Sequence, residues 1–100
     1  MHIEALNIFC EVVRHQSFSR GANASSVSQS AASQTVRQME NQLGIQLIDR
    51  SKRPWRLTAE GKTFFKGCQE IVERYRELQD AIRQRRETSG HTVRVASIYS

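Results

Sequence analysis

The sequence has 100 residues, of which 38% are hydrophobic and 25% charged, with a formal net charge of +5 and a pI of about 9.9. This length allows one small domain, and the composition is that of an ordinary globular chain. No apolar run approaches the ~20 residues of a membrane-spanning helix, and the N-terminus lacks the features of a secretory signal. We therefore expect a cytoplasmic protein with no membrane partner, and the positive charge favours a polyanionic partner.

A first helix is predicted over residues 2–15, because apolar residues recur there at the steps of three and four that define one helix face. These residues are Ile3, Leu6, Cys10 and Val13, broadened by Phe9 and Val12. Phe18 is expected to return to the core. A short second helix is predicted from Arg20 to about Ser25, with Ser19 as its N-cap and small residues that suit close helix packing.

A third helix is predicted to begin after the N-cap Ser28 and to end near Leu43, where Gly44 suits a helix terminus. Its inward stripe is Ala32, Val36, Met39 and Leu43. The opposite face carries Gln29, Ser30, Ser33, Gln34 and Arg37. A solvated helix face more often has paired Glu and Lys, whereas this one has no acid before Glu40. Because Gln, Ser and Arg match the donors and acceptors of base edges, the pattern favours a helix that reads the DNA major groove.

A small β-hairpin is predicted from residues 46–49 and 55–57, with a basic turn between them. Four cations fall within seven residues without an acid: Arg50, Lys52, Arg53 and Arg56. Pro54 fits the tip or edge of a hairpin, where its missing N–H is not needed. Trp55 is expected to pack beneath the loop rather than to stack on DNA. Charge alone leaves open whether the loop binds a polyanion or is a solvated surface loop.

The longest predicted element begins after Thr58 as N-cap and continues to about Thr88. Apolar residues follow at alternating steps of four and three: Phe64, Cys68, Ile71, Tyr75, Leu78 and Ile82. A helix of this length is a rod of roughly 45 Å, and a domain this small cannot cover both sides of it. The seam therefore predicts a homodimer through this helix.

The remaining chemistry indicates no catalytic or metal site. Cys10 and Cys68 are not in metal-type spacing and are expected to be reduced structural thiols. The histidines adjoin no cluster of Cys or carboxylates, so an enzyme is not expected and no cofactor is predicted for this sequence. Residues 93–98 have the pattern of a buried strand, which alone has nothing to pair with. We therefore expect the sequence to be part of a longer protein.

Four segments resemble the amino-terminal domain of LysR-type transcriptional regulators. They are FSRGA at 18–22, VSQSAASQ at 27–34, LGIQLIDR at 43–50 and LTAEG at 57–61. The resemblance implies a mainly α fold: a winged helix-turn-helix of three helices and a small β-hairpin wing, followed by a long dimerisation helix. It implies double-stranded DNA as partner, with residues Ser28, Gln29, Ser30, Ser33, Gln34 and Arg37 on the recognition helix. Arg50, Lys52, Arg53 and Pro54 complete the predicted DNA contacts, and Arg53-Pro54 would form a wing tip in the minor groove.

The resemblance also implies an organisation: a DNA-binding domain at 1–58, a linker and dimerisation helix at 59–89, and the start of a ligand-binding domain at 90–100. Regulators of this kind usually form dimers through the long helix and tetramers through a domain that binds a small-molecule effector. The sequence departs from the family pattern at Gly21 (usually Ala), Ser25 (usually Leu), Ser30 (often Pro) and Gln34 (often Arg). The competing hypothesis is a coiled-coil scaffold whose basic loop is incidental.

Overall fold

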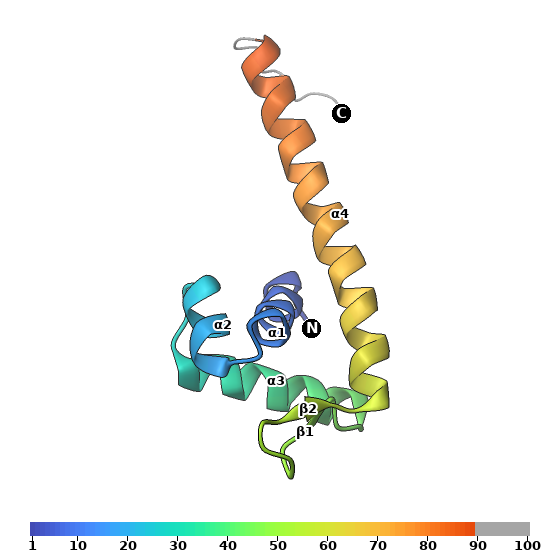
Figure 1. Cartoon of the computed structure of the whole chain (residues 1–100). Helices are drawn as coiled ribbons and strands as arrows, with labels where there is room; N and C mark the ends of the chain where they lie inside the picture. The colour runs from blue at the N-terminus through green and yellow to red at the C-terminus, as the bar shows by residue number, and fades with distance from the viewer. Residues whose placement is uncertain (90–100) are drawn as a thin grey trace.

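The computed structural model describes residues 1–89. Its elements are α1 (Ile3–His15), α2 (Phe18–Ala24), α3 (Gln29–Leu43), β1 (Ile48–Asp49), β2 (Arg56–Leu57) and α4 (Ala59–Ser89). The first three helices pack together, the antiparallel hairpin lies near the C-terminal end of α3, and α4 extends away from this unit as a long rod (Figure 1). This is the predicted mainly α architecture. The expected strand at 93–98 lies outside the described residues.

The start of α2 differs from the sequence prediction. Its N-cap is Ser17, whose hydroxyl accepts a hydrogen bond from the Arg20 amide at 3.1 Å, so Ser19 is not the cap. Ser17 has the extended backbone that an N-cap needs, whereas Ser19 is already in the first helical turn. The helix therefore begins two residues early and includes Phe18. The Phe18 ring lies 5.7 Å from that of Trp55, which confirms both as packed residues.

Close packing of α1 on α2 depends on Gly21. A Cβ atom on this glycine would lie 2.5 Å from the Cα of Val12, which is fully buried. Glycine costs about 1 kcal/mol in helix propensity relative to alanine. In this chain glycine is needed despite that cost, because the backbones of α1 and α2 approach so closely that no space remains for a methyl group.

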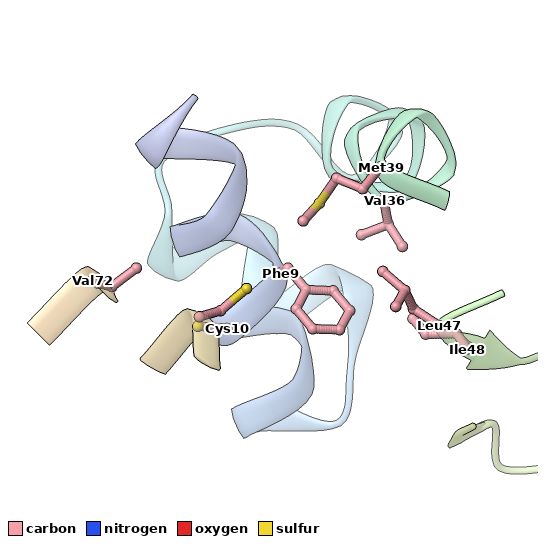
Figure 2. Close-up of a cluster of buried hydrophobic side chains, with 8 residues drawn as sticks. Phe9, Cys10, Val36, Met39, Leu47, Ile48 and Val72 are labelled. Carbon is pink, nitrogen blue, oxygen red and sulfur yellow. The ribbon is translucent and has the colours of Figure 1, made fainter. Parts of the chain in front are cut away.

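The core gathers around Phe9, which is 0% exposed. Figure 2 shows its ring beside α1, with Met39 and Val36 of α3 above it, Leu47 and Ile48 on one side, and Cys10 and Val72 on the other. The other buried members of this cluster are Cys10, Val36, Met39, Leu47, Ile48, Cys68 and Val72. Burial of each large apolar side chain contributes roughly 1.5–3 kcal/mol, so the core fixes α3, the hairpin and the first half of α4 as one unit.

The predicted termini of α3 are confirmed, but one inward residue is not. The Ser28 hydroxyl accepts from the Ala31 amide at 3.0 Å, and Gly44 ends the helix in the left-handed conformation with φ 71°. Leu43 was expected to face the core, yet it is 40% exposed. Met39 is buried as expected, and the other buried residue in the last turns is Glu40, because the chain turns back towards the hairpin at that point.

Thr58 links the hairpin to α4 and is the predicted N-cap. Its hydroxyl accepts from the Gly61 amide at 2.9 Å and donates to the Gln46 carbonyl at 2.6 Å. The Thr58 amide donates to the Leu47 carbonyl at 3.0 Å. A Cβ atom on Gly61 would overlap that same carbonyl oxygen. The base of the long helix is therefore held against the backbone before β1.

Two glycines of α4 offer the same substitution with opposite expected results. Gly61→Ala should lower the free energy of unfolding by about 1–3 kcal/mol, because the methyl group collides with the Leu47 backbone. At Gly67 no atom lies within 4 Å of the added Cβ, so Gly67→Ala should raise the free energy of unfolding by about 0.5–1 kcal/mol. Urea unfolding followed by circular dichroism, at one protein concentration, measures both. Changes of the same sign would contradict the packing described for Gly61.

Candidate nucleic-acid interface

The outer face of α3 is polar and open to solvent. Its residues are Ser28, Gln29, Ser30, Ser33, Gln34 and Arg37, here called the reading face. All are exposed except Ser33, which is half-buried. Within residues 1–89, no intramolecular hydrogen bond or ion pair engages the side chains of Gln29, Gln34 or Arg37. Their donors and acceptors are therefore available to a partner.

The inner face of α3 fixes how the reading face is presented. Ala32, Val36 and Met39 are each no more than 2% exposed, so rotation of the helix about its axis would expose core residues. The corner between α2 and α3 is held by hydrogen bonds from the Ser26 amide to Asn23 at 3.1 Å and from the Val27 amide to Ala22 at 3.0 Å. Two helices joined by this short, fixed corner form a helix-turn-helix.

The turn between β1 and β2 presents Lys52, Arg53 and Pro54, here called the wing tip, and all three are exposed. The turn is ordered at its start by Ser51, whose amide donates to the Asp49 carboxylate at 3.0 Å and whose hydroxyl donates to the same oxygen. These hydrogen bonds, that of the hydroxyl foremost, hold the pKa of Asp49 below its usual range. The wing tip thus projects cations from a turn with a defined shape.

Arg50 was predicted to contact DNA, but it lies in an internal ion pair. Its guanidinium donates to both carboxylate oxygens of Glu40, at 3.1 and 3.3 Å. The same carboxylate accepts from the amides of Leu47 and Ile48, at 2.9 and 3.2 Å. Arg50 is therefore reassigned from the DNA contacts to the attachment of the hairpin to α3.

The structural role of Glu40 was not predicted from the sequence. It is 8% exposed, and a buried carboxylate requires such partners because an unpaired one carries a large desolvation penalty. The sequence does contain a signal, since Glu40 follows Val36 by four residues on the inward side of α3. An acid at an inward position indicates a buried cation nearby, and the basic run begins at Arg50.

The seam of α4 divides into a covered part and an exposed part. Phe64 packs edge-on against Phe9 with ring centroids 5.5 Å apart, and Cys68 is only 2% exposed. Both belong to the core of their own chain, so the assignment of Cys68 to a dimer contact is corrected. The exposed stripe is Ile71 (53%), Tyr75 (43%), Leu78 (60%) and Ile82 (52%).

Arg76 joins α4 to α1 at the point where the two helices part. Its guanidinium donates to the Asn7 side chain at 2.8 Å and lies 3.8 Å from the carboxylate of Glu11. Glu11 also pairs with Arg14 at 3.0 Å. We call Asn7, Glu11 and Arg76 the joint. It complements the apolar contacts of Cys68 and Val72, so the direction of α4 is fixed relative to the helices below it.

The cysteines are structural in position. Cys10 and Cys68 are 1% and 2% exposed and pack together between α1 and α4. The hydrogen bond with Cys10 and the burial of the site raise the pKa of the Cys68 thiol. Among residues 1–89, no group of three or more His, Cys, Asp or Glu side chains could hold a metal ion. No helix in that range is long and apolar enough to cross a membrane.

The helix-turn-helix, the hairpin and the long helix define a winged helix-turn-helix protein. A family model described as "Bacterial regulatory helix-turn-helix protein, lysR family" matches residues 3–62. The chain belongs to this family.

Similar proteins of known sequence are transcriptional regulators. CrgA from Neisseria meningitidis serogroup C, an HTH-type transcriptional regulator, is 39% identical over 70 residues, which are 70% of this chain and 23% of CrgA. YhjC from Escherichia coli K12, an uncharacterized HTH-type transcriptional regulator, is 33% identical over 82 residues, which are 82% of this chain and 27% of YhjC. The chain thus spans about a quarter of the length of these relatives.

Similar solved structures include DNA complexes of the same family. The BenM DBD in complex with benA site 1 DNA has a TM-score of 0.78 and 31% identity, with 91% of this chain and 100% of that chain covered. DarR from Vibrio fischeri in complex with DNA has a TM-score of 0.71 and 28% identity, with 89% of this chain and 30% of DarR covered. With at least 89% of this chain covered, both matches extend into the long helix.

Proposed function

We propose that this chain is the sequence-specific DNA-binding part of a bacterial, ligand-responsive transcriptional regulator. The observation that carries the proposal is the reading face: exposed Gln, Ser and Arg side chains on a capped helix whose rotation is fixed by the core. Such side chains match the hydrogen-bonding pattern of base edges in the major groove. The solved complexes of BenM and DarR with DNA support the same role for this chain.

The proposed contacts divide between two grooves. The reading face, from Ser28 to Arg37, contacts base edges in the major groove. The wing tip enters the adjacent minor groove, where narrow A·T-rich segments are strongly negative and attract arginine. Arg50 is omitted from these contacts because Glu40 neutralises it. The corner residues and Thr58 position the two contacting surfaces without touching DNA.

The proposed assembly is a homodimer through the exposed stripe of α4. Four large apolar or aromatic side chains, each at least 43% exposed within the described residues, follow one another along one side of the helix. A second copy provides a matching surface, because a two-fold axis brings identical stripes together. Tetramers of the full-length regulator and an effector bound by another domain belong to the same proposal. So does a cytoplasmic, nucleoid-associated location.

The geometry of the bound site tests the whole proposal. Two recognition helices related by a two-fold axis predict an inverted repeat, with half-site centres about one helical turn, ~34 Å, apart. The repeat is obtained by selecting bound DNA from a random pool. Insertion of five base pairs rotates one half-site to the far side of the duplex, so binding in gel-shift titrations should fall to the non-specific level. Unchanged affinity would exclude simultaneous contact with both halves, and a scaffold protein would select no repeat at all.

Substitutions on the two contacting surfaces should have different signatures. Gln29→Ala should reduce binding to the selected site by about 1–3 kcal/mol and relax the preference at one base pair, because a base contact is lost. Arg53→Ala should weaken binding, keep the major-groove preference and reduce the salt slope by about one, because one cation that offsets phosphate charge is lost. Titrations at several salt concentrations measure both. An equal loss with Gln29→Ala on every sequence would show that the reading face is assigned wrongly.

A further inference from the structure

The basic run contains one cation that neither the fold nor the proposed contacts use. Arg50 is paired with Glu40, and two further cations belong to the wing tip. The remaining one, Arg56, lies on β2 and is exposed. Within residues 1–89, no intramolecular hydrogen bond or ion pair engages its guanidinium. Its charge and its N–H donors are therefore available to a partner.

The hairpin directs Arg56 to its outer face and places an acid beside it. Trp55 and Leu57, on either side of Arg56 in the chain, both pack against the core. Because successive side chains of a strand point to opposite faces, Arg56 points away from the core. The register sets Asp49 of β1 directly opposite Arg56. Directly opposed residues of an antiparallel pair share one face, with Cβ atoms ~4.5–5.5 Å apart, so this register favours an ion pair between the two.

Ser51 holds the carboxylate with which Arg56 would otherwise pair. The Ser51 amide donates to one oxygen of Asp49 at 3.0 Å, and the Ser51 hydroxyl donates to the same oxygen. In the part of the chain that the structure describes, Asp49 makes no ion pair with Arg56. Hydrogen bonds to a charged acceptor contribute more than an exposed ion pair does. The contacts of Ser51 therefore win over the pairing across the strands.

The place of Arg56 beside the wing tip favours a DNA phosphate as its partner. The minor groove is only ~6 Å wide and is bordered by the phosphates of both strands. A hairpin whose tip enters this groove must cross one of its edges with the residues that follow the tip. Arg56 comes two residues after Pro54, the last residue of the wing tip. A guanidinium suits phosphate because its planar donors match two phosphate oxygens at once.

We propose that Arg56 binds a backbone phosphate at the edge of the minor groove, and that Ser51, by holding Asp49, is the positioning residue that keeps Arg56 unpaired for this contact. The inference rests on the DNA-binding function and the wing placement proposed above. A phosphate contact fixes the position of the wing on the duplex without reading a base. Ser51 and Asp49 thus act on DNA affinity through Arg56, although neither touches the DNA.

Removal of the charge at position 56 tests the phosphate contact. Arg56→Gln should weaken binding roughly three- to tenfold on every DNA sequence and reduce the salt slope by about one for each bound chain. Arg56→Lys should keep the slope, because it keeps the charge. Lys66→Gln removes an exposed cation from α4 and should leave affinity and slope nearly unchanged. Gel-shift titrations of the selected site and of unrelated DNA at several salt concentrations measure these effects.

A double-mutant cycle tests the role of Ser51. Ser51→Ala should weaken DNA binding by about two- to fivefold, the range that an exposed ion pair supports, because Asp49 then pairs with Arg56. In an Asp49→Asn background the amide oxygen still accepts from the Ser51 amide, so the turn keeps its shape. Ser51→Ala should have no effect on DNA binding in that background, since no acid remains to pair with Arg56.

The outcomes separate this inference from the proposed function. Equal losses from Ser51→Ala in both backgrounds would show that Ser51 acts only on the shape of the turn, which overturns its positioning role. An Arg56→Gln chain that binds the selected site with the affinity and salt slope of the wild type would overturn the phosphate contact and leave the proposed function standing. A wild-type chain that selects no DNA sequence would remove the proposed function, and the inference with it.

Discussion

Leu78→Asp is expected to convert the proposed dimer into monomers and to reduce binding to the proposed inverted repeat by about 100-fold or more. Leu78 is the most exposed large apolar side chain of the stripe, at 60%, and a carboxylate there would have to be desolvated against a second apolar surface. The loss in DNA binding is large because a dimer engages its second half-site at a high effective concentration, which a monomer lacks. Light scattering at tens of micromolar and gel-shift titration measure the two effects.

The control for this substitution adds the same charge elsewhere on the helix. Gln84 is exposed and lies off the stripe, so Gln84→Asp should preserve both the dimer and the DNA affinity. Ile82→Asp, on the stripe and 52% exposed, should behave like Leu78→Asp. If the wild-type chain is itself monomeric under these conditions, the stripe has another purpose and the dimer must be abandoned.

Glu40→Ala is expected to lower the free energy of unfolding by about 3 kcal/mol or more. The substitution leaves the amides of Leu47 and Ile48 without their acceptor and Arg50 without its counter-charge. An unsatisfied buried donor costs about 1–3 kcal/mol, and a buried ion pair that loses one member costs about 3–5 kcal/mol. The Arg50 side chain is 30% exposed and partly hydrated, so the lower part of the combined range applies. Urea denaturation monitored by circular dichroism gives the value.

Glu40→Gln separates charge from hydrogen bonding at this site. The amide oxygen still accepts from the backbone, so we expect roughly half the loss of Glu40→Ala. Glu73→Ala removes an exposed acid from α4 and should change stability by no more than about 0.5 kcal/mol. A Glu40→Ala protein as stable as Glu73→Ala would show that the carboxylate does not hold the hairpin to α3.

Sequence periodicity predicted the helices well where caps and apolar spacing agree. For α3 and α4, Ser28 and Thr58 mark the starts, and both were identified. The start of α2 was displaced because Ser17 and Ser19 are equally good caps by composition, and only the extended backbone at Ser17 decides between them. Periodicity also identifies the apolar side of a helix without identifying what covers it. Phe64 and Cys68 share a seam with Leu78, yet only the former two meet α1.

The prediction of DNA contacts has a similar limit, because the sequence does not show which cations are paired within the chain. Arg50 and Arg53 have the same chemistry and lie three residues apart, but Arg50 meets a carboxylate on α3 that is distant by ten residues in sequence. A local count of cations contains no such information. The reading face could be predicted from sequence because it depends only on which residues alternate with an apolar stripe on one helix.

The joint has a consequence for the spacing between the two half-sites of a regulatory site. Arg76 ties α4 to α1 through Asn7 at 2.8 Å, so the helix leaves the DNA-binding unit as a stiff lever, and each further residue carries its end another ~1.5 Å. In the proposed dimer, α3 then determines the base sequence of each half-site, while the joint determines how many base pairs separate the two half-sites. In that dimer, changes at Asn7, Glu11 or Arg76 would alter the spacing without altering a side chain of the reading face.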